Sequence, residues 1–134
     1  MDMHRAGSRP TRRASADYFT GTVWQDPIVV AEAPARVVAT RVSFEPGART
    51  AWHTHPLGQT LYVLHGGGRF QTKGQPIVEI RPGDAIWIPP GEKHWHGASP
   101  HSGMIHIAIQ EAEKGSAVTW MEKVTDEDYG KPVG

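Results

Sequence analysis

The chain has 134 residues, enough for one domain with a modest hydrophobic core, and Lys+Arg and Asp+Glu each number 14. The formal net charge is therefore zero, which excludes the basic excess that nucleic-acid binding normally requires. The absence of cysteine excludes disulfides, thiolate metal sites and cysteine nucleophiles.

Residues 1–16 form a basic segment that contains the Arg12–Arg13 pair. No apolar run follows it, so the pattern is not that of a secretory signal, and no later stretch reaches the ~20 apolar residues that a membrane helix needs. We expect a loosely ordered N-terminal arm over 1–16, either free or docked on a second subunit, and one domain over 17–134. We also expect a cytoplasmic protein that binds neither membranes nor nucleic acid.

Short runs rich in β-branched and aromatic residues fill the domain, separated by turn sequences such as EPGA, RPGD and PPGEK. The runs are 36–44, 60–66, 68–73, 77–80, 85–89, 103–109 and 117–124. Many short strands in one small domain predict an all-β sandwich or small barrel. The one predicted helix is short, over Thr125–Tyr129, where Thr125 caps the helix and acidic residues occupy its first turn.

The sequence AWHTHPLGQT, residues 51–60, carries the first chemical signal. Because alternate side chains of a strand point to the same side, His53 and His55 share one face. The segment 56–58 ends this strand, and a short turn brings Gln59 back toward the two histidines. Convergence of three such side chains predicts a metal site, although its third polar group is an uncharged amide instead of the usual carboxylate.

Two further segments place histidines on an inward face. His94 and His96 flank Trp95, and His106 and Gln110 alternate with isoleucines on the strand near 103–110. Five histidines and two glutamines are thus expected to form a polar patch inside an apolar barrel. The other three histidines, His4, His65 and His101, are expected to be hydrogen-bonded structural residues.

Three large side chains near the histidines have structural interpretations. Trp52 and Trp95 alternate away from the histidines, which favours packing in the core or between subunits. A platform for an aromatic substrate is the alternative for the tryptophans. Arg49 has the strand parity of His53, but its place next to a turn favours a solvated side chain.

The spacing of residues around these segments resembles the two signature motifs of the cupin superfamily. The matching residues are Gly47, His53, His55, Gln59 and Gly66 in the first motif, and Gly83, Pro89, Gly91 and His94 in the second. The resemblance implies a single-domain cupin jelly-roll β-barrel of two antiparallel sheets, with its core at about residues 20–122. Two positions depart from the usual pattern, since Gln59 replaces a glutamate and Ala98 replaces a frequent asparagine.

A closer resemblance, to small bacterial cupins that act as manganese-dependent hydroxynitrile lyases, covers nearly the whole chain. It is carried by DYFTGTV, FEPGARTAWHTHPLGQTL, PGEKHWHGA, HIAIQE and VTWMEKVTDE, stretches that also occur in small cupins without an assigned activity. The resemblance implies manganese(II) held by His53, His55, Gln59 and His94. Nitrogen and oxygen ligands by themselves leave iron(II), cobalt, nickel and zinc open.

The implied ligand set is neutral, because each histidine must be neutral to bind and Gln59 coordinates through its amide oxygen. The ion then keeps its full charge, which favours an anion and strengthens Lewis acidity. His96 and His106 are the acid/base candidates beside it. Strand parity places His96 one pleat beyond His94, roughly 6–7 Å away and outside the ligand shell. We further expect Gln110 to orient the substrate or a histidine, and Thr40 and Val42 to line the pocket.

The resemblance therefore predicts a lyase that cleaves and forms aromatic cyanohydrins, such as mandelonitrile, with benzaldehyde and hydrogen cyanide as the small-molecule partners. Two alternatives stay open. One is an iron-dependent cupin dioxygenase, against which the missing carboxylate ligand counts, and the other is a metal-stabilised small-molecule-binding cupin without turnover. Because the edges and outer faces of a small barrel need cover, we expect a homodimer or homotetramer.

Overall fold

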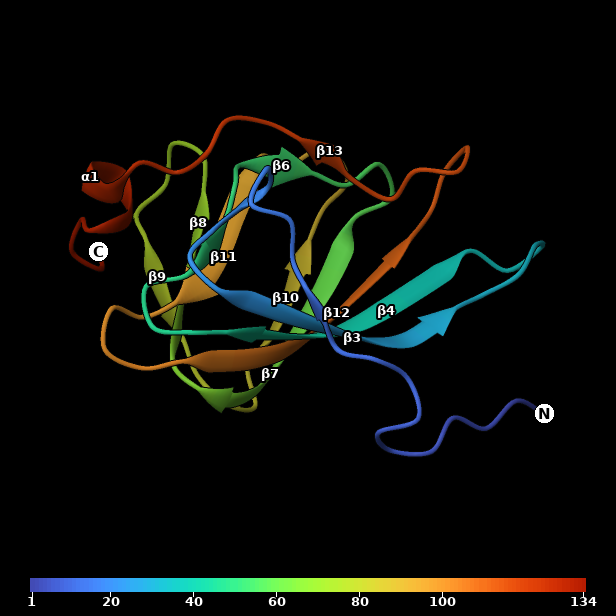
Figure 1. Cartoon of the computed structure of the whole chain (residues 1–134). Coiled ribbons are helices and arrows are strands. Elements are labelled where there is room, and N and C mark those ends of the chain that lie inside the picture. The colour runs from blue at the N-terminus through green and yellow to red at the C-terminus, as the bar shows by residue number, and fades with distance from the viewer.

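Two antiparallel sheets curl around a shared interior in the computed structural model, which describes all residues from 1 to 134 (Figure 1). One sheet has six strands in the order β1 (Arg12–Arg13), β3 (Val23–Val30), β4 (Val37–Phe44), β12 (Met104–Glu111), β7 (Gln59–Gly66) and β10 (Ala85–Ile88). The other has β13 (Thr119–Trp120), β6 (His53–Thr54), β11 (His94–Ala98), β5 (Arg49–Thr50) and β2 (Phe19–Thr20), with β8 (Gly68–Thr72) paired to β11 and β9 (Val78–Ile80) paired to β8. This arrangement confirms the predicted all-β jelly-roll barrel of two antiparallel sheets.

The alternation expected of half-buried strands is clear on β12, which pairs with β4 on one side and β7 on the other. Met104, His106 and Ala108 are buried, whereas Ile105 and Ile107 between them are only half-buried. The inward positions of β12 therefore include an imidazole beside apolar groups, as strand parity predicted.

The barrel interior is polar at one end and apolar at the other. On β7 the buried positions change from Gln59 to Leu61 and Val63, and on β11 they change from two histidines to Ala98. In the pairing of β12 with β7, Gln110 lies opposite Gln59, so polar groups of different strands gather at the same end.

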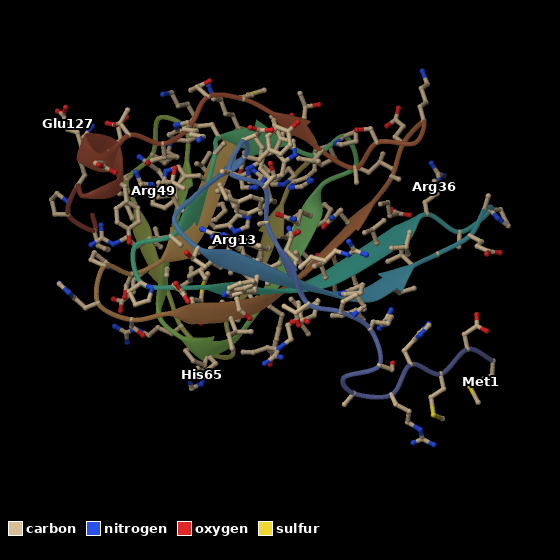
Figure 2. The ribbon with its side chains drawn as sticks, in the orientation of Figure 1. Met1, Arg13, Arg36, Arg49, His65 and Glu127 are labelled. Carbon is tan, nitrogen blue, oxygen red and sulfur yellow. The ribbon has the colours of Figure 1, made fainter.

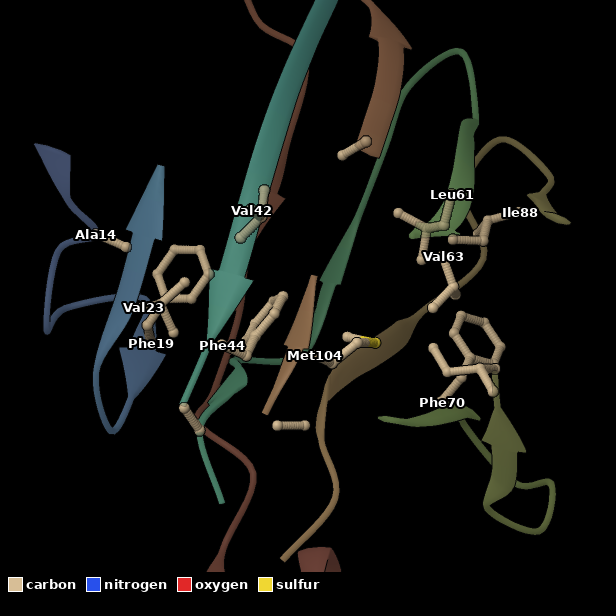
Figure 3. Packing of buried hydrophobic residues seen from close by; sticks show 14 residues of the cluster. Ala14, Phe19, Val23, Val42, Phe44, Leu61, Val63, Phe70, Ile88 and Met104 are labelled. Atoms are coloured by element: carbon tan, nitrogen blue, oxygen red, sulfur yellow. The ribbon is translucent and has the colours of Figure 1, made fainter. Parts of the chain in front are cut away.

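The apolar part of the interior is a cluster of 14 buried side chains contributed by both sheets (Figure 3). Leu61, Val63 and Ile88 in this cluster have no exposed surface, and Phe44 and Met104 are nearly as buried. Burying a side chain of this size stabilises a fold by roughly 1.5–3 kcal/mol. This apolar cluster therefore stabilises the part of the barrel that adjoins its polar end.

The N-terminal arm is partly integrated into the six-stranded sheet. Arg12 and Arg13 form β1, which pairs with β3, and Ala14 is buried in the apolar cluster. Residues 1–8 are exposed. The arm was predicted to end at residue 16, but in the structure its last part, residues 12–14, already packs against the barrel.

The predicted C-terminal helix is confirmed as α1 (Asp126–Tyr129). Thr125 caps it, because its side-chain oxygen accepts a hydrogen bond from the backbone N–H of Asp128 at 3.1 Å. This four-residue helix is the only one in the structure, and it is far too short to cross a membrane.

Arg49 ties the C-terminal segment to the barrel, and the expectation of a solvated side chain is wrong. The residue is 5% exposed, and its guanidinium donates to the carbonyl oxygen of Val124 at 2.7 Å and pairs with Asp126 at 2.7 Å. The guanidinium also lies 4.5 Å from the ring centroid of Tyr129, and Figure 2 shows Arg49 beside α1. The guanidinium of Arg49 was expected to be hydrated, but the C-terminal segment provides its hydrogen-bonding and charged partners instead.

A second apolar cluster lies under the C-terminal segment and contains Trp52, Ile77, Trp95, Val124 and Tyr129. The indole N–H of Trp95 donates to the side-chain oxygen of Gln71 at 2.8 Å, so its polar atom is satisfied in this buried place. The prediction that Trp52 and Trp95 point away from the histidines and serve packing is therefore confirmed.

Candidate metal centre

A cavity of about 80 Å³ lies between the two sheets at the polar end of the barrel. Eight of the nine side chains singled out from the sequence line it, namely Thr40, Val42, His53, His55, Gln59, His96, His106 and Gln110. His94 is the ninth, and its ring centroid lies 4.2 Å from that of His53. His4, His65 and His101 were expected to be hydrogen-bonded structural residues, but all three are exposed surface residues, and Figure 2 shows His65 on the outer surface.

Three of the buried histidines have one ring nitrogen held by a backbone carbonyl. The Nδ1 atoms of His53, His55 and His94 lie 2.9, 2.7 and 2.9 Å from the carbonyl oxygens of Ala51, Ala117 and Glu92, respectively. A carbonyl only accepts, so each Nδ1 carries the proton and each Nε2 keeps its lone pair. This is the outer hydrogen bond that orients histidine ligands in metal sites.

The free ends of this group have no partner within the protein. The Nε2 atoms of His55 and His94 and the Oε1 atom of Gln59 are buried and make no hydrogen bond. The amide nitrogen of Gln59 donates to the side-chain oxygen of Gln110 at 3.1 Å, which turns Oε1 of Gln59 away from that bond. Buried acceptors without donors cost free energy, and a divalent cation is the partner that nitrogen and oxygen lone pairs of this kind suit. These residues therefore fit a divalent metal ion.

The tightest group of ring nitrogens differs from the predicted ligand set in one member. Nitrogen atoms of His53, His94 and His96 all lie within 4.8 Å of one another, whereas parity was expected to keep His96 outside the ligand shell. The ring centroids of His94 and His96 are 5.7 Å apart and their planes differ by 14°. The two rings lie closer together than the roughly 6–7 Å expected from strand geometry. The His96 ring is therefore near the candidate ligands His53 and His94.

His96 and His106 form a hydrogen-bonded pair. Nε2 of His106 lies 3.0 Å from Nδ1 of His96, and the ring centroids are 4.8 Å apart. The remaining nitrogens, Nε2 of His96 and Nδ1 of His106, are buried without a partner. The ring of Phe44 packs on both imidazoles, with centroid distances of 6.0 and 5.2 Å, so the pair is held in place on its apolar side.

Burial favours the neutral form of all five imidazoles. It lowers the pKa of His94 and His106 to about 4, and it lowers the pKa of His53 and His96 well below the ordinary value of 6.5. The pKa of His55 is lowered as well, again mainly by burial. Neighbouring imidazoles add to the effect at His53, His94 and His96, because a positive charge on one disfavours a second. Neutral imidazole is the form that binds metal or accepts a proton.

Seven further residues line the cavity and were not singled out from the sequence: Phe19, Gln25, Phe44, Thr50, Ala108, Val118 and Trp120. Thr50 is also a hydrogen-bond partner, since its hydroxyl accepts from the backbone N–H of His96 at 3.2 Å. Trp120 lies within the run 117–124 that was predicted as a strand, but its strand pairing with His53 depends on tertiary structure. The residue pattern of the run 117–124 indicated a strand, but it could not indicate which strand it pairs with.

Comparisons with known proteins agree with this geometry. The family model described as the cupin domain matches residues 40–107, a range that contains all four predicted ligands. The chain is 57% identical over 129 residues to the (R)-mandelonitrile lyase of Granulicella tundricola, covering 96% of this chain and 98% of that protein.

Solved structures share the fold. A cupin-like protein of Thermotoga maritima matches with a TM-score of 0.84 at 39% identity, covering 96% of this chain and 95% of that one. The polyketide cyclase RemF of Streptomyces resistomycificus matches with a TM-score of 0.72 at 21% identity, covering 96% of this chain and 91% of that one. The second likeness concerns the fold alone.

Proposed function

The chain belongs to the cupin family and is an enzyme of the lyase class, and we propose that it is a metal-dependent hydroxynitrile lyase. Its substrates would be aromatic cyanohydrins such as mandelonitrile, which it would cleave to benzaldehyde and hydrogen cyanide or form from them. The observation that carries the proposal is a buried set of unpaired nitrogen and oxygen lone pairs beside a hydrogen-bonded histidine pair. The identity of 57% to a mandelonitrile lyase supports the choice of reaction.

We propose that His53, His55, Gln59 and His94 hold the metal ion, the histidines through Nε2 and Gln59 through Oε1. Manganese(II) is the proposed ion, and iron(II), cobalt, nickel and zinc suit the same donor types. When bound, the ion supplies a Lewis acid that stabilises negative charge on the reacting oxygen and on the departing cyanide. All four residues are neutral ligands, so they leave the charge of the ion undiminished for this purpose.

His96 is the proposed acid and base. Either ring can carry the proton shared between His96 and His106, and the proposed tautomer is the one in which Nε2 of His106 accepts. Nδ1–H of His96 then donates across the 3.0 Å contact, and Nε2 of His96 keeps a lone pair without a partner. This is the nitrogen that is available to take a proton from the substrate.

Nε2 of His96 alone can accept and return the proton that the reaction transfers. In cleavage, Nε2 of His96 takes the hydroxyl proton, the carbonyl forms, and the carbon–carbon bond breaks with its electron pair leaving on cyanide. Nε2 of His96 then gives the same proton to cyanide, which leaves as hydrogen cyanide. While His96 is charged, its Nδ1–H donates a stronger, charge-assisted hydrogen bond to neutral His106. His106 is therefore a positioning residue that orients His96 through this hydrogen bond.

Gln110, Thr40 and Val42 are proposed to position the substrate. The side-chain oxygen of Gln110 is occupied by Gln59, which leaves its amide N–H groups to donate to a substrate oxygen or to cyanide. Thr40 and Val42 lie opposite Ala108 and His106 in the pairing of β4 with β12, and both line the cavity. They form the wall that faces the histidine pair.

Cyanide release from mandelonitrile, measured beside oxygen uptake, tests the proposal. The protein is prepared metal-free and then loaded separately with manganese, iron(II), cobalt, nickel or zinc. We expect cyanide release that depends on the metal, without oxygen consumption. Oxygen uptake without cyanide release would replace the proposal with a dioxygenase, and metal binding without either reaction would replace it with a binding protein.

We also propose a homodimer or a homotetramer. Tyr62, Leu64, Trp87 and Ile109 are exposed on neighbouring strands of the six-stranded sheet, which leaves an apolar outer face. Closed symmetry is the common way to cover such a face. Light scattering should give at least twice the mass of one chain, 14.7 kDa. A monomer at working concentrations would overturn this proposal.

A further inference from the structure

The segment that joins the two sheets at the polar end of the barrel, residues 112–120, forms one border of the cavity. It leaves the six-stranded sheet after β12 and enters the other sheet as β13, which pairs with β6 (Figure 1). We call residues 112–120 the crossing segment. Gln110 precedes it and Trp120 ends it, and both line the cavity together with Val118.

The crossing segment contacts the metal-binding candidates at two points. The carbonyl oxygen of Ala117 accepts the hydrogen bond from Nδ1 of His55 at 2.7 Å. The ring of Trp120 lies 4.7 Å from the ring of His53, with the two planes 40° apart. A substrate at the metal centre would therefore lie close to side chains of this segment.

Aromatic neighbours fix the position of Trp120. Tyr18 stacks on the indole with centroids 4.9 Å apart and planes 11° apart, and Phe19 meets it edge-on at 5.4 Å. Trp120 itself is half-buried and lines the cavity. A large aromatic surface held from behind in this way is a preformed apolar wall.

The size of the cavity places the apolar part of an aromatic substrate against this wall. A closed cavity of about 150 Å³ is known to hold benzene, whereas the cavity here measures about 80 Å³. The inner walls include His53, His96 and His106, which the reacting polar atoms need. An aromatic ring attached to those atoms must then lie against the remaining lining, which includes Val118 and Trp120.

We propose that Trp120 determines specificity by receiving the aromatic ring of the substrate, with Val118 beside it. The inference rests on the proposed cyanohydrin reaction and adds to it the residue that distinguishes aromatic from small aliphatic substrates. Contacts between aromatic rings favour an aromatic substrate by about tenfold at most beyond its apolar area. The alternative, that Trp120 only packs on Tyr18 and His53, predicts no such preference.

The test compares Trp120→Leu and Trp120→Phe with Trp24→Leu. Trp24 is an exposed tryptophan on the outer side of β3 and does not line the cavity, so it serves as the matched control. Cyanide release is measured with mandelonitrile and with a small aliphatic cyanohydrin, and bound manganese is measured in each variant. We expect Trp120→Leu to lower kcat/KM for mandelonitrile by about tenfold, mainly through KM, and to change the aliphatic reaction less than about twofold. Trp120→Phe should keep most of the preference, and Trp24→Leu should keep all of it.

Equal losses on both substrates, or an unchanged preference in Trp120→Leu, would overturn the inference and leave the proposed function intact. Binding of benzyl alcohol and of 1-propanol, measured by calorimetry on each metal-loaded protein, separates the two ideas in the other direction. If the wild-type protein releases no cyanide, but Trp120→Leu selectively loses benzyl alcohol binding, the wall is supported and the proposed reaction is wrong. If benzyl alcohol binds all variants equally, Trp120 does not receive the aromatic ring, whichever reaction the protein catalyses.

Discussion

Two groups of histidines share one cavity and differ in what holds their second nitrogen. In the ligand group, His53, His55 and His94, that nitrogen is bound to a backbone carbonyl. In the histidine pair, His96 and His106, it is bound to the other member of the pair. A carbonyl can only accept, so the ligand group has one tautomer, whereas either member of the pair can donate to the other.

The difference separates residues suited to hold an ion from residues suited to move a proton. A fixed tautomer keeps the same lone pair directed at the site, which a resident cation requires. A shared proton between two imidazoles leaves one outer nitrogen free to gain and lose a proton during a reaction. Side-chain type alone, histidine in both cases, does not distinguish these roles, but the acceptor does.

The largest expected effect comes from removing a member of the ligand group. His53→Ala should lose bound metal and all metal-dependent turnover together. Disturbing an outer partner of a ligand already costs about 10–100-fold in metal affinity, and losing the ligand should cost more. Metal analysis after dialysis and cyanide release check this, with the exposed His65→Ala as the control that changes neither. Retained metal with full turnover in His53→Ala would break the division between the two groups.

Removing the proposed base should reduce turnover and leave the metal. His96→Ala should lower kcat by about 10²–10⁴, the usual cost of losing a general base, at unchanged metal content. His106→Ala should cost less, because His106 acts through His96. Collapse of activity in His106→Ala alone would exchange the two roles. Joint loss of metal and activity in His96→Ala would move His96 into the ligand group, and full activity in both variants would refute the mechanism.

Gln59→Glu tests whether the neutral charge of the ligand group matters. The carboxylate should hold a hard divalent ion at least as tightly, but it lowers the net charge of the site by one and should lower turnover. Gln110 can turn its amide to donate to the new carboxylate, so the contact between residues 59 and 110 survives. The loss in kcat should be smaller than that of His96→Ala. Equal or higher turnover at full metal occupancy would show that neutral ligands are not the reason for activity.

The two groups should also share a pH dependence of stability. Burial lowers the pKa of His94 and His106 to about 4, below the ordinary 6.5. Between these values the unfolded chain binds protons that the folded chain does not. The free energy of unfolding of the metal-free protein should therefore fall as pH falls, by about 1.4 kcal/mol per pH unit for each histidine. Urea unfolding across this window measures the slope, and His106→Asn should remove the share of one histidine. A flat profile would contradict the burial of neutral imidazoles.

Local rules explain why much of the fold and cavity was predictable. The period of two in a strand makes the facing of His94, His96 and His106 a matter of counting, and the structure places all three in the barrel interior. Turns at Pro and Gly marked the seven predicted runs, each of which contains a strand, but β1, β2 and β3 lie before the first run and were missed. The motif spacing named the four ligand candidates, and the cavity brings them together with the two acid/base candidates.

The features that were missed depend on partners far away in the chain. Arg49 is buried because Val124 and Asp126, 75 and 77 residues later, supply its acceptors. The carbonyl that orients His55 comes from Ala117, 62 residues away, and Trp120 reaches the cavity by pairing with His53. The alternation of side chains along a strand predicts which face of the sheet a residue lies on, but not which distant segment packs against it. It also did not give how closely the ring nitrogens of His96 approach those of His53 and His94, because side-chain rotation sets that distance.

The clamp made by Arg49 has a consequence for cooperativity. Arg49 is adjacent to Thr50, whose hydroxyl accepts the backbone N–H of His96, and its guanidinium holds the segment that carries Val124 and Tyr129. Because these contacts join the last part of the chain to the strands that carry the histidines, we expect the two regions to unfold together. A metal ion that binds only the folded state would then slow amide hydrogen exchange in the C-terminal segment, although it touches no residue there.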